Sequence, residues 1–319
     1  MSFSVMGVGS ALPEHVVTND MLSGFLDTSD EWITTRTGIK ERRVVTTETL
    51  AELSATAAKR ALAMAGIEAA QLSYILCATT SADYAIPSLA CQVQQLLGAS
   101  CPAMDANAAC TGFLYALDMA DALFARDPNA RVLVIGAEAM SRLVDWNDRS
   151  TAVLFGDGAG ALVLGLGSDL KSMLVTAVGD PDPLYARHAD GNSPYAVKRE
   201  RAPLRMDGHA GYRFAVPTIV RDVSAAIARA GMTEDDIDAV LLHQANLRIV
   251  DAAAQRLNIP RDKFKTNIQS RGNTSAASIP ILMDELHREG QLPQGSVLAL
   301  AAFGGGLTTG ACVLAWGVS

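Results

Sequence analysis

Apolar residues recur along this chain of 319 residues in two alternating patterns, one typical of amphipathic helices and one of buried strands. Residues 57–77 read as an amphipathic helix that ends at Ala-Gly, followed by a short turn and an apolar strand. Residues 222–242 repeat that order of helix, turn and strand. Because apolar strands alternate with helices, the pattern predicts an α/β fold with mixed sheets covered by helices.

The repeated order indicates an internal duplication with a nearly constant separation. Gly66 matches Gly231, a separation of 165 residues (231 − 66). The same separation places Cys110 on a polar turn of the second half, and it aligns the apolar segments that begin at Val132 and Val297. Three elements matched in order are far less expected by chance than one, so we expect two similar α/β halves.

The halves are expected to span residues 1–168 and 169–319. The later segments 160–164 and 310–314 match at a shorter separation of 150 residues (310 − 160). The first half therefore carries an insertion, which we place between residues 138 and 155 and expect to form a loop.

Two apolar helices and two polar segments stand out from this pattern. The helices expected at 51–65 and 111–125 are rich in alanine and almost wholly apolar, so we expect buried helices packed between the halves. Residues 28–48 and 179–206 lack a clear period and are expected to be long loops of a functional kind. The second segment is equally compatible with a surface linker.

Cys110 precedes a nearly all-apolar stretch that reads as a helix, so it is expected at or just before a helix N-terminus. Amide groups there favour a thiolate and lower the pKa of a cysteine. Small neighbours would let a substrate approach, which makes Cys110 a candidate nucleophile. An ordinary buried cysteine remains the alternative, and it is the interpretation for the other four, Cys77, Cys91, Cys101 and Cys312.

His243 and Asn273 are the other candidates for chemistry. His243 directly follows an apolar strand, the place where α/β proteins carry site residues. Asn273 lies in the turn that the duplication pairs with the turn of Cys110. A pseudo-two-fold axis would bring both turns together at the centre, although a structural histidine and a helix-capping asparagine remain open.

Two glycine-rich runs, 155–161 and 303–306, are related by the repeat. Neither is followed by the Lys-Ser/Thr of a phosphate-binding loop. We expect tight turns between strands whose backbone N–H groups face a substrate, as an oxyanion hole requires. The sequence contains no zinc-type spacing, so neither a metal nor another cofactor is expected.

Composition narrows the class of protein. The chain is 49% hydrophobic and 19% charged with a net charge of −8, which excludes a disordered chain and argues against a general nucleic-acid binder. Five unpaired-looking cysteines favour a reducing compartment. We find neither a signal peptide nor an apolar run long enough to span a membrane, and we expect a cytoplasmic protein with no membrane partner.

Taken together and in order, the motifs resemble the 3-oxoacyl-[acyl-carrier-protein] synthase III family, the initiating condensing enzymes of fatty acid synthesis. The resemblance runs nearly end to end and implies the thiolase-like fold, a duplicated α/β unit. Its motifs are Thr28-Ser-Asp-Glu-Trp-Ile, Arg36-Thr-Gly-Ile, Ala108-Ala-Cys-Thr-Gly-Phe, Asp148-Arg, Phe155-Gly-Asp-Gly-Ala-Gly-Ala, His243-Gln-Ala-Asn-Leu-Arg, Gly272-Asn-Thr-Ser-Ala-Ala-Ser and Ala302-Phe-Gly-Gly-Gly.

The resemblance implies a role for each site residue. Cys110 would take the acyl group of an acyl-CoA primer, an acyl-cysteine intermediate. His243 and Asn273 would stabilise the enolate formed as malonyl-acyl carrier protein loses carbon dioxide. The amides of Cys110 and Gly305 would form the oxyanion hole, and Phe303 would be the apolar neighbour of the malonyl carboxylate.

The resemblance also implies how the carriers bind. It places CoA against Trp32, Arg36, Arg149 and Asn246, with the adenine between Trp32 and Arg149. It places the acidic acyl carrier protein against Gln244, Arg248 and Arg256. Taken alone, Arg248 is equally a solvated charge.

Two departures and three alternatives bear on specificity. Ile86 stands where relatives often carry Phe, at a position that the family directs into the acyl pocket of a homodimer partner, so we expect a longer or branched primer. The Leu307-Thr308-Thr309 loop is less aromatic than in relatives. A condensing enzyme of secondary metabolism, a thiolase-fold acyltransferase and, more distantly, a cysteine hydrolase remain alternatives.

Overall fold

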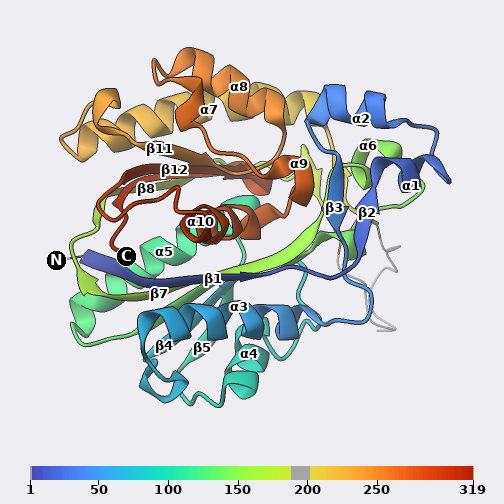
Figure 1. Ribbon diagram of the computed structural model, residues 1–319. Helices are drawn as coiled ribbons and strands as arrows, with labels where there is room; N and C mark the ends of the chain where they lie inside the picture. Colours follow the sequence, from blue (N-terminus) through green and yellow to red (C-terminus); the bar gives the residue numbers. More distant parts are fainter. Residues whose placement is uncertain (1, 188–201, 319) are drawn as a thin grey trace.

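The computed structural model describes residues 2–187 and 202–318, which build five alternating layers of helices and sheets (Figure 1). One outer layer holds α3 (Leu50–Ala65) and α4 (Leu89–Leu97), and the other holds α7 (Gly208–Arg229) and α8 (Leu247–Arg256). Between the two sheets lie α5 (Gly112–Arg126) and α10 (Ser278–Arg288). The prediction of an α/β fold with central buried helices is confirmed.

The two sheets repeat one strand order. The five-stranded sheet runs β1 (Ser2–Ala11), β7 (Asp157–Gly167), β6 (Val132–Ala139), β4 (Tyr74–Ala78) and β5 (Ala103–Ala106). The four-stranded sheet runs β8 (Leu170–Ala177), β13 (Thr308–Ala315), β12 (Val297–Gly304) and β11 (Ala239–Leu242). In both, the first two pairings are antiparallel and the third is parallel. Each sheet therefore repeats the same unit, and β7 and β8 flank the boundary expected between the halves.

The Ala-rich helix predicted at 51–65 does not lie between the halves, which corrects that expectation. α3 covers the outer face of the first sheet, against β1 and β7, whereas α5 and α10 share the central core with both sheets. Alanine serves close packing here, because a Cβ on Gly7 would lie 2.3 Å from Ala61 O and one on Gly9 would lie 2.5 Å from Ala57 O. Small side chains let the helix backbone touch the strand.

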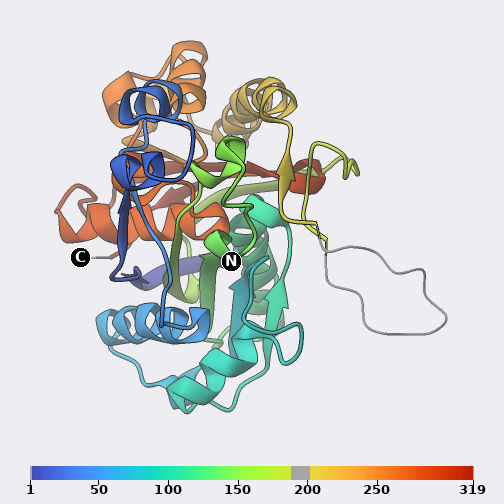
Figure 2. The ribbon, with the colours of Figure 1, turned by 90° about the vertical axis from the view of Figure 1, so that its right-hand side faces the viewer.

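The polar segment 28–48 is partly regular rather than a loop. It contains α2 (Asp30–Thr37), capped by Ser29 and ended by Gly38 at φ 83°, and β3 (Glu41–Arg43), which pairs with β2 (Val16–Thr18). The short α1 (Asn19–Ser23) precedes them. Figures 1 and 2 place α2 beside α8, where Gly38 contacts Leu247. A polar segment of the first half thus leans on the second half.

The expected insertion is confirmed. β6 and β7 are joined by residues 140–156, which include α6 (Arg149–Ala152), whereas Gly305–Leu307 alone joins β12 to β13. In segment 179–206, β9 (Leu184–Tyr185) pairs with β10 (Arg205–Met206), and residues 188–201 lie outside the described part. Among the described helices, none is long and apolar enough to cross a membrane.

Candidate active site

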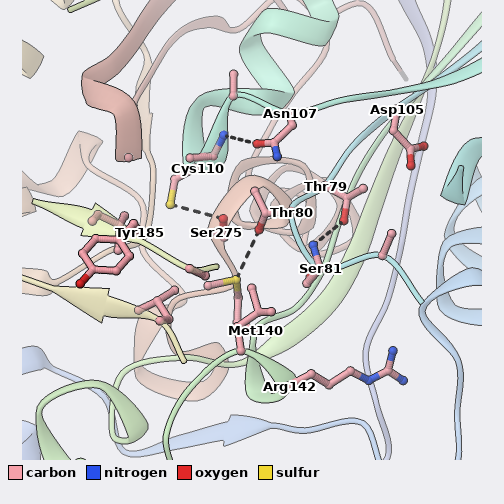
Figure 3. Close-up of a pocket in the computed structure, with 18 of the residues that line it drawn as sticks. Thr79, Thr80, Ser81, Asp105, Asn107, Cys110, Met140, Arg142, Tyr185 and Ser275 are labelled. Atoms are coloured by element: carbon pink, nitrogen blue, oxygen red, sulfur yellow. Dashed lines mark hydrogen bonds between the residues drawn. The ribbon is translucent and has the colours of Figure 1, made fainter. Parts of the chain in front are cut away.

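A cavity of about 1080 Å³ opens at the carboxyl ends of the parallel strands β4, β5 and β6 (Figure 3). Residues that follow these strands line it, together with Cys110, Ser275 and the turn Gly305–Thr308. The ribbon of β9 and β10 forms another wall, through Leu184, Tyr185 and Leu204. The described ends of segment 179–206 therefore shape the cavity, as its expected functional role requires.

Cys110 lies in a 3₁₀ turn, Ala109–Thr111, that leads directly into α5. Ala109 adopts φ 49°, a strained value for a residue other than glycine. Asn107 supports the bend, because its Oδ1 accepts the N–H of Ala109 at 3.3 Å. A Cβ on Gly304 would lie 2.8 Å from the Cys110 nitrogen, so only a glycine lets the β12 turn approach the nucleophile this closely.

The second half repeats this turn around Asn273, with a register that corrects the sequence alignment by one residue. Ser275 adopts the same φ of 49° as Ala109 and begins the equivalent 3₁₀ turn, Ser275–Ala277. The separation at this point is 166 residues (275 − 109), so Cys110 corresponds to Ala276 rather than Ser275. Asn273 corresponds to Asn107. Long helices and strands kept the separation of 165, and the bend absorbed the extra residue.

Asn273 is buried and held on both sides of its backbone. Its N–H donates to Leu154 O at 2.8 Å, and its carbonyl accepts the N–H of Gly156 at 3.0 Å. Its side-chain Oδ1 accepts the N–H of Ser275 at 2.9 Å. The side-chain NH₂ has no printed partner among the described residues, so the contacts fix the amide oxygen and leave its donor side available for chemistry.

The glycine run 155–161 is not a tight turn, which corrects the prediction for the first of the two runs. Gly158 and Gly160 lie within β7, where a Cβ on Gly160 would lie 2.6 Å from Ile281 N of α10. Glycine is required there for close packing of the central helix rather than for N–H donors. The second run does form the expected turn, with Gly305 on the cavity wall.

His243 follows β11 at its carboxyl end, as predicted, and is 2% exposed. Burial lowers the pKa of the imidazole to about 3, so the ring is neutral near pH 7. Nδ1 lies 2.9 Å from Ser278 Oγ, and Ser278 Oγ also accepts the N–H of Gln244 at 3.3 Å. The Ser278 proton is then directed to Nδ1, an arrangement that leaves the imidazole hydrogen on Nε2. Phe303 packs edge-on against the ring at 5.3 Å.

The electrostatic surroundings of Cys110 differ from the prediction of a lowered pKa. Burial raises the pKa of the thiol to about 12, and the negative charge of the nearby Glu138 adds to that shift. Ser275 Oγ lies 3.3 Å from Sγ, as Figure 3 shows, and opposes the shift only in part. A short 3₁₀ turn contributes less than a long helix, and loss of hydration outweighs it.

The sequence and the fold can now be compared with known proteins. The family model described as "3-Oxoacyl-[acyl-carrier-protein (ACP)] synthase III" matches residues 104–180, and the model of its C-terminal part matches residues 227–316. A beta-ketoacyl-[acyl-carrier-protein] synthase III of Aquifex aeolicus is 45% identical over 98% of this chain and 99% of its own. One of Clostridium acetobutylicum is 41% identical over 99% of both.

The solved structure titled 3-oxoacyl-[acyl-carrier-protein] synthase III from Aquifex aeolicus VF5 superposes with a TM-score of 0.91 at 43% identity, covering 98% of this chain and 100% of that one. The chain belongs to the 3-oxoacyl-[acyl-carrier-protein] synthase III family. Its fold is the thiolase-like fold of that family, and it is an acyltransferase of the condensing type.

The residues that the synthase III resemblance assigns to CoA lie together at α2, α6 and the start of α8. The Arg36 and Arg149 guanidinium carbons lie 4.6 and 5.1 Å from the centre of the Trp32 ring. Arg149 also binds Asp27, through its backbone and side-chain oxygens. An adenine between Trp32 and Arg149 therefore requires Arg149 to leave this ion pair, since the two groups are now in direct contact.

The start of α8 contradicts one expectation for this synthase III. Gln244 is fully buried, and its amide binds Leu242 O at 2.7 Å and accepts the N–H of Asn267 at 3.3 Å. It has no surface to offer a carrier protein, so that prediction is wrong. Asn246 caps α8, and its NH₂ donates to Arg36 O at 3.1 Å. Arg248 and Arg256 are exposed and remain available for docking.

Ile86 lies outside the cavity of its own chain. Its side chain is 87% exposed, on the loop after β4 that also carries Tyr84, whereas Tyr84 and Ala85 line the cavity. This placement fits a residue that serves a second copy of the chain, but it leaves the assembly itself a prediction.

Sequence reasoning did not single out three site residues of this family member. Glu138 ends an apolar strand, Ser275 lies inside the quoted motif of Asn273, and Ser278 follows it. Glu138, a charged residue in an otherwise apolar strand, was the available signal. Ser275 and Ser278 have no sequence feature that separates them from helix-capping serines. Among the described residues, no three His, Cys, Asp or Glu side chains gather as a metal site.

Proposed function

We propose that this protein condenses an acyl-CoA primer with malonyl-acyl carrier protein, with loss of carbon dioxide, and so initiates fatty acid synthesis. The observation that carries the proposal is the arrangement around one turn. Ser275 links Cys110 to Asn273 through its hydroxyl and its backbone N–H, and Ser278 binds His243 three residues later. A nucleophile and two neutral donors at one cavity suit this reaction.

In the proposed loading step, Cys110 Sγ attacks the thioester carbon of the primer and displaces CoA. The N–H groups of Cys110 and Gly305 stabilise the oxyanion, because the Gly304 contact brings the two backbones together. The acyl-cysteine divides one difficult condensation into two easier steps.

In the proposed condensation step, the malonyl thioester oxygen accepts hydrogen bonds from His243 Nε2 and the Asn273 amide. Both groups are neutral donors, and the burial that lowers the pKa of His243 to about 3 keeps it so. Their dipoles are held in place before the reaction, which favours the enolate over the carboxylate ground state. Phe303 adds an apolar wall, which favours loss of the charged carboxylate.

We further propose a cytoplasmic homodimer that docks the acidic carrier protein on Arg248 and Arg256 and uses no metal or other cofactor. In this dimer Ile86 borders the acyl pocket of the second copy, and its exposure supports that role. Ile86→Phe should shift the preferred primer towards shorter acyl chains, which competition between acyl-CoAs of several lengths will measure. An unchanged preference would contradict this assignment.

The decisive experiment follows the intact mass of the protein after incubation with a panel of acyl-CoAs, with and without malonyl-acyl carrier protein. An acyl adduct on Cys110 that discharges into a 3-oxoacyl-carrier product supports the proposal. An adduct that water clears without the carrier favours a hydrolase. Transfer to an oxygen or nitrogen acceptor without loss of carbon dioxide favours an acyltransferase, and use of CoA-bound acceptors alone favours secondary metabolism.

A further inference from the structure

Glu138 is a buried acid that the condensation described above does not use. It lies near the end of β6 and is 0% exposed. Three donors hold it independently of the nucleophile: the N–H of Thr80 at 3.1 Å, the hydroxyl of Thr80 at 3.0 Å, and the hydroxyl of Ser81. Ser81 itself accepts the N–H of Ala139 at 2.7 Å, so its own proton points to the carboxylate.

A fourth contact connects this acid to the nucleophile. Ser275 Oγ lies 3.0 Å from Glu138 Oε1 and 3.3 Å from Cys110 Sγ. The hydroxyl has one proton, and an ionised carboxylate only accepts hydrogen bonds. Ser275 therefore donates to Glu138 and accepts from the thiol, which orients the chain from Cys110 through Ser275 to Glu138.

We propose that Ser275 and Glu138 form a proton relay that takes the Cys110 proton during acyl loading and returns it after condensation. The inference rests on the proposed function of the site. Ser275 touches the reacting sulfur, whereas Glu138 is a positioning residue that acts through Ser275.

The proton balance closes over the two steps. In loading, Sγ bonds to the thioester carbon as the S–H bond breaks. The thiol proton moves to Ser275, the Ser275 proton moves to Glu138, and CoA leaves as a thiolate that takes a proton from water. In condensation, the carbon left by carbon dioxide displaces Sγ. The proton then returns from Glu138 through Ser275 to the cysteine.

The surroundings of the two groups suit a relay. His243 is neutral, and Glu138 is the charged group whose field acts on the Cys110 thiol. Burial raises the pKa of Glu138, which makes its carboxylate a stronger base than one in water. The same charge opposes a free thiolate, so the resting thiol keeps its proton until the substrate arrives.

Two variants separate the relay from simple charge repulsion. Ser275→Ala removes the link and keeps the charge; Ala109 holds φ 49° in the matching turn, so alanine fits this backbone. Glu138→Gln removes the charge. The matched control is Ser141→Ala, which removes a hydroxyl that donates to another buried acid, Asp157, at 2.6 Å without contact to Cys110.

Single-turnover loading is measured by intact mass, and the pH profile of Cys110 alkylation by iodoacetamide is measured by peptide mass without substrate. The relay predicts about 10²-fold slower loading in both variants and little change in Ser141→Ala. Alkylation should show a lowered thiol pKa in Glu138→Gln and a raised one in Ser275→Ala. Loading that is slower while the thiolate is more abundant identifies a relay.

Glu138→Gln that loads as fast as the parent would overturn the proposal, and so would Ser275→Ala with a normal rate. If Glu138→Gln does not fold by thermal melting, a solvent deuterium effect on loading that Ser275→Ala abolishes supports the relay, and an effect that survives overturns it. If the parent loads no acyl-CoA, the proposed function fails separately. The alkylation profiles then decide, and profiles that neither variant shifts overturn the relay.

Discussion

The turns 107–112 and 273–278 follow the same backbone course and carry different chemistry. Each begins with an asparagine whose Oδ1 accepts the N–H two residues on, at 3.3 Å in the first turn and 2.9 Å in the second. Each contains a residue at φ 49°. The first turn then places a thiol on α5, where the second turn has Ala276, and the second turn places a hydroxyl where the first has Ala109.

The turns also differ in burial. The first is half-exposed and faces the cavity, whereas residues 272–278 are buried. Ser278 holds His243, and its counterpart in the first turn, Gly112, has no side chain to do so. One copy of a strained bend therefore exposes the nucleophile to substrate. The other copy builds a rigid set of donors against it.

The largest expected effect comes from removing the feature unique to the first turn. Cys110→Ser should lower acyl loading and condensation by at least roughly 10³-fold, because a hydroxyl without a strong base is a poor nucleophile. Intact mass after incubation with acyl-CoA measures loading. Cys91→Ser is the matched control, since Cys91 is half-buried away from the cavity. Normal loading of Cys110→Ser would remove Cys110 as the nucleophile.

The next effect compares the two asparagines. Asn273→Ala should slow condensation by about 10²-fold to 10³-fold, because one donor to the enolate is lost, while acyl loading on Cys110 continues. Asn107→Ala removes the same local hydrogen bond from the first turn and should cost less than about tenfold in either step. Separate assays of loading and of carbon dioxide release measure the difference. Equal losses in the two variants would mean that Asn273 only supports its turn.

A third comparison concerns the glycines of β7 and β13 behind the turns. A Cβ on Gly160 would meet the backbone of α10 at 2.6 Å, whereas one on Gly310 would meet side chains of α5 at 3.2 Å or more. Gly160→Ala should therefore lower the free energy of unfolding by about 3 kcal/mol, and Gly310→Ala by about 1 kcal/mol. Denaturant unfolding measures both. Equal values would show that α5 and α10 approach their sheets alike.

The smallest effect is the pH dependence that His243 adds to stability. Its pKa is about 3 in the folded protein and near 6.5 in the unfolded chain, so unfolding takes up a proton between these values. The free energy of unfolding should therefore fall below pH 6.5, by up to about 1.4 kcal/mol per pH unit from this group. His243→Gln should lose that slope and run parallel to the parent above pH 6.5. An unchanged slope would mean that His243 titrates normally.

The parts of the fold that could be predicted have local causes. Helix ends at Gly66 and Gly231 were visible because both adopt the positive φ that glycine tolerates. The insertion before β7 was visible as a change in separation. The one-residue error at Ser275 arose because the strained bend has no periodic pattern of its own, so nothing in the sequence marked where the register changed.

Burial caused the errors in the site. Gln244 is polar and adjoins a site residue, which suggests an exposed contact, yet Leu242 and Asn267 bind its amide inside the protein. The pKa of Cys110 was expected to be low from the following helix, and burial beside Glu138 raises it instead. Both outcomes depend on residues that lie on other elements.

The sequence by itself determined the duplicated α/β architecture, the family and the candidates Cys110, His243 and Asn273, because periodicity, caps and motifs are properties of short segments. Only the tertiary structure decided that α5 and α10 occupy the centre, that His243 is neutral and that Ser275 joins Cys110 to Glu138. Hydration and hydrogen-bond partners are set by neighbours far apart in the chain, since packing from both halves determines what water can reach.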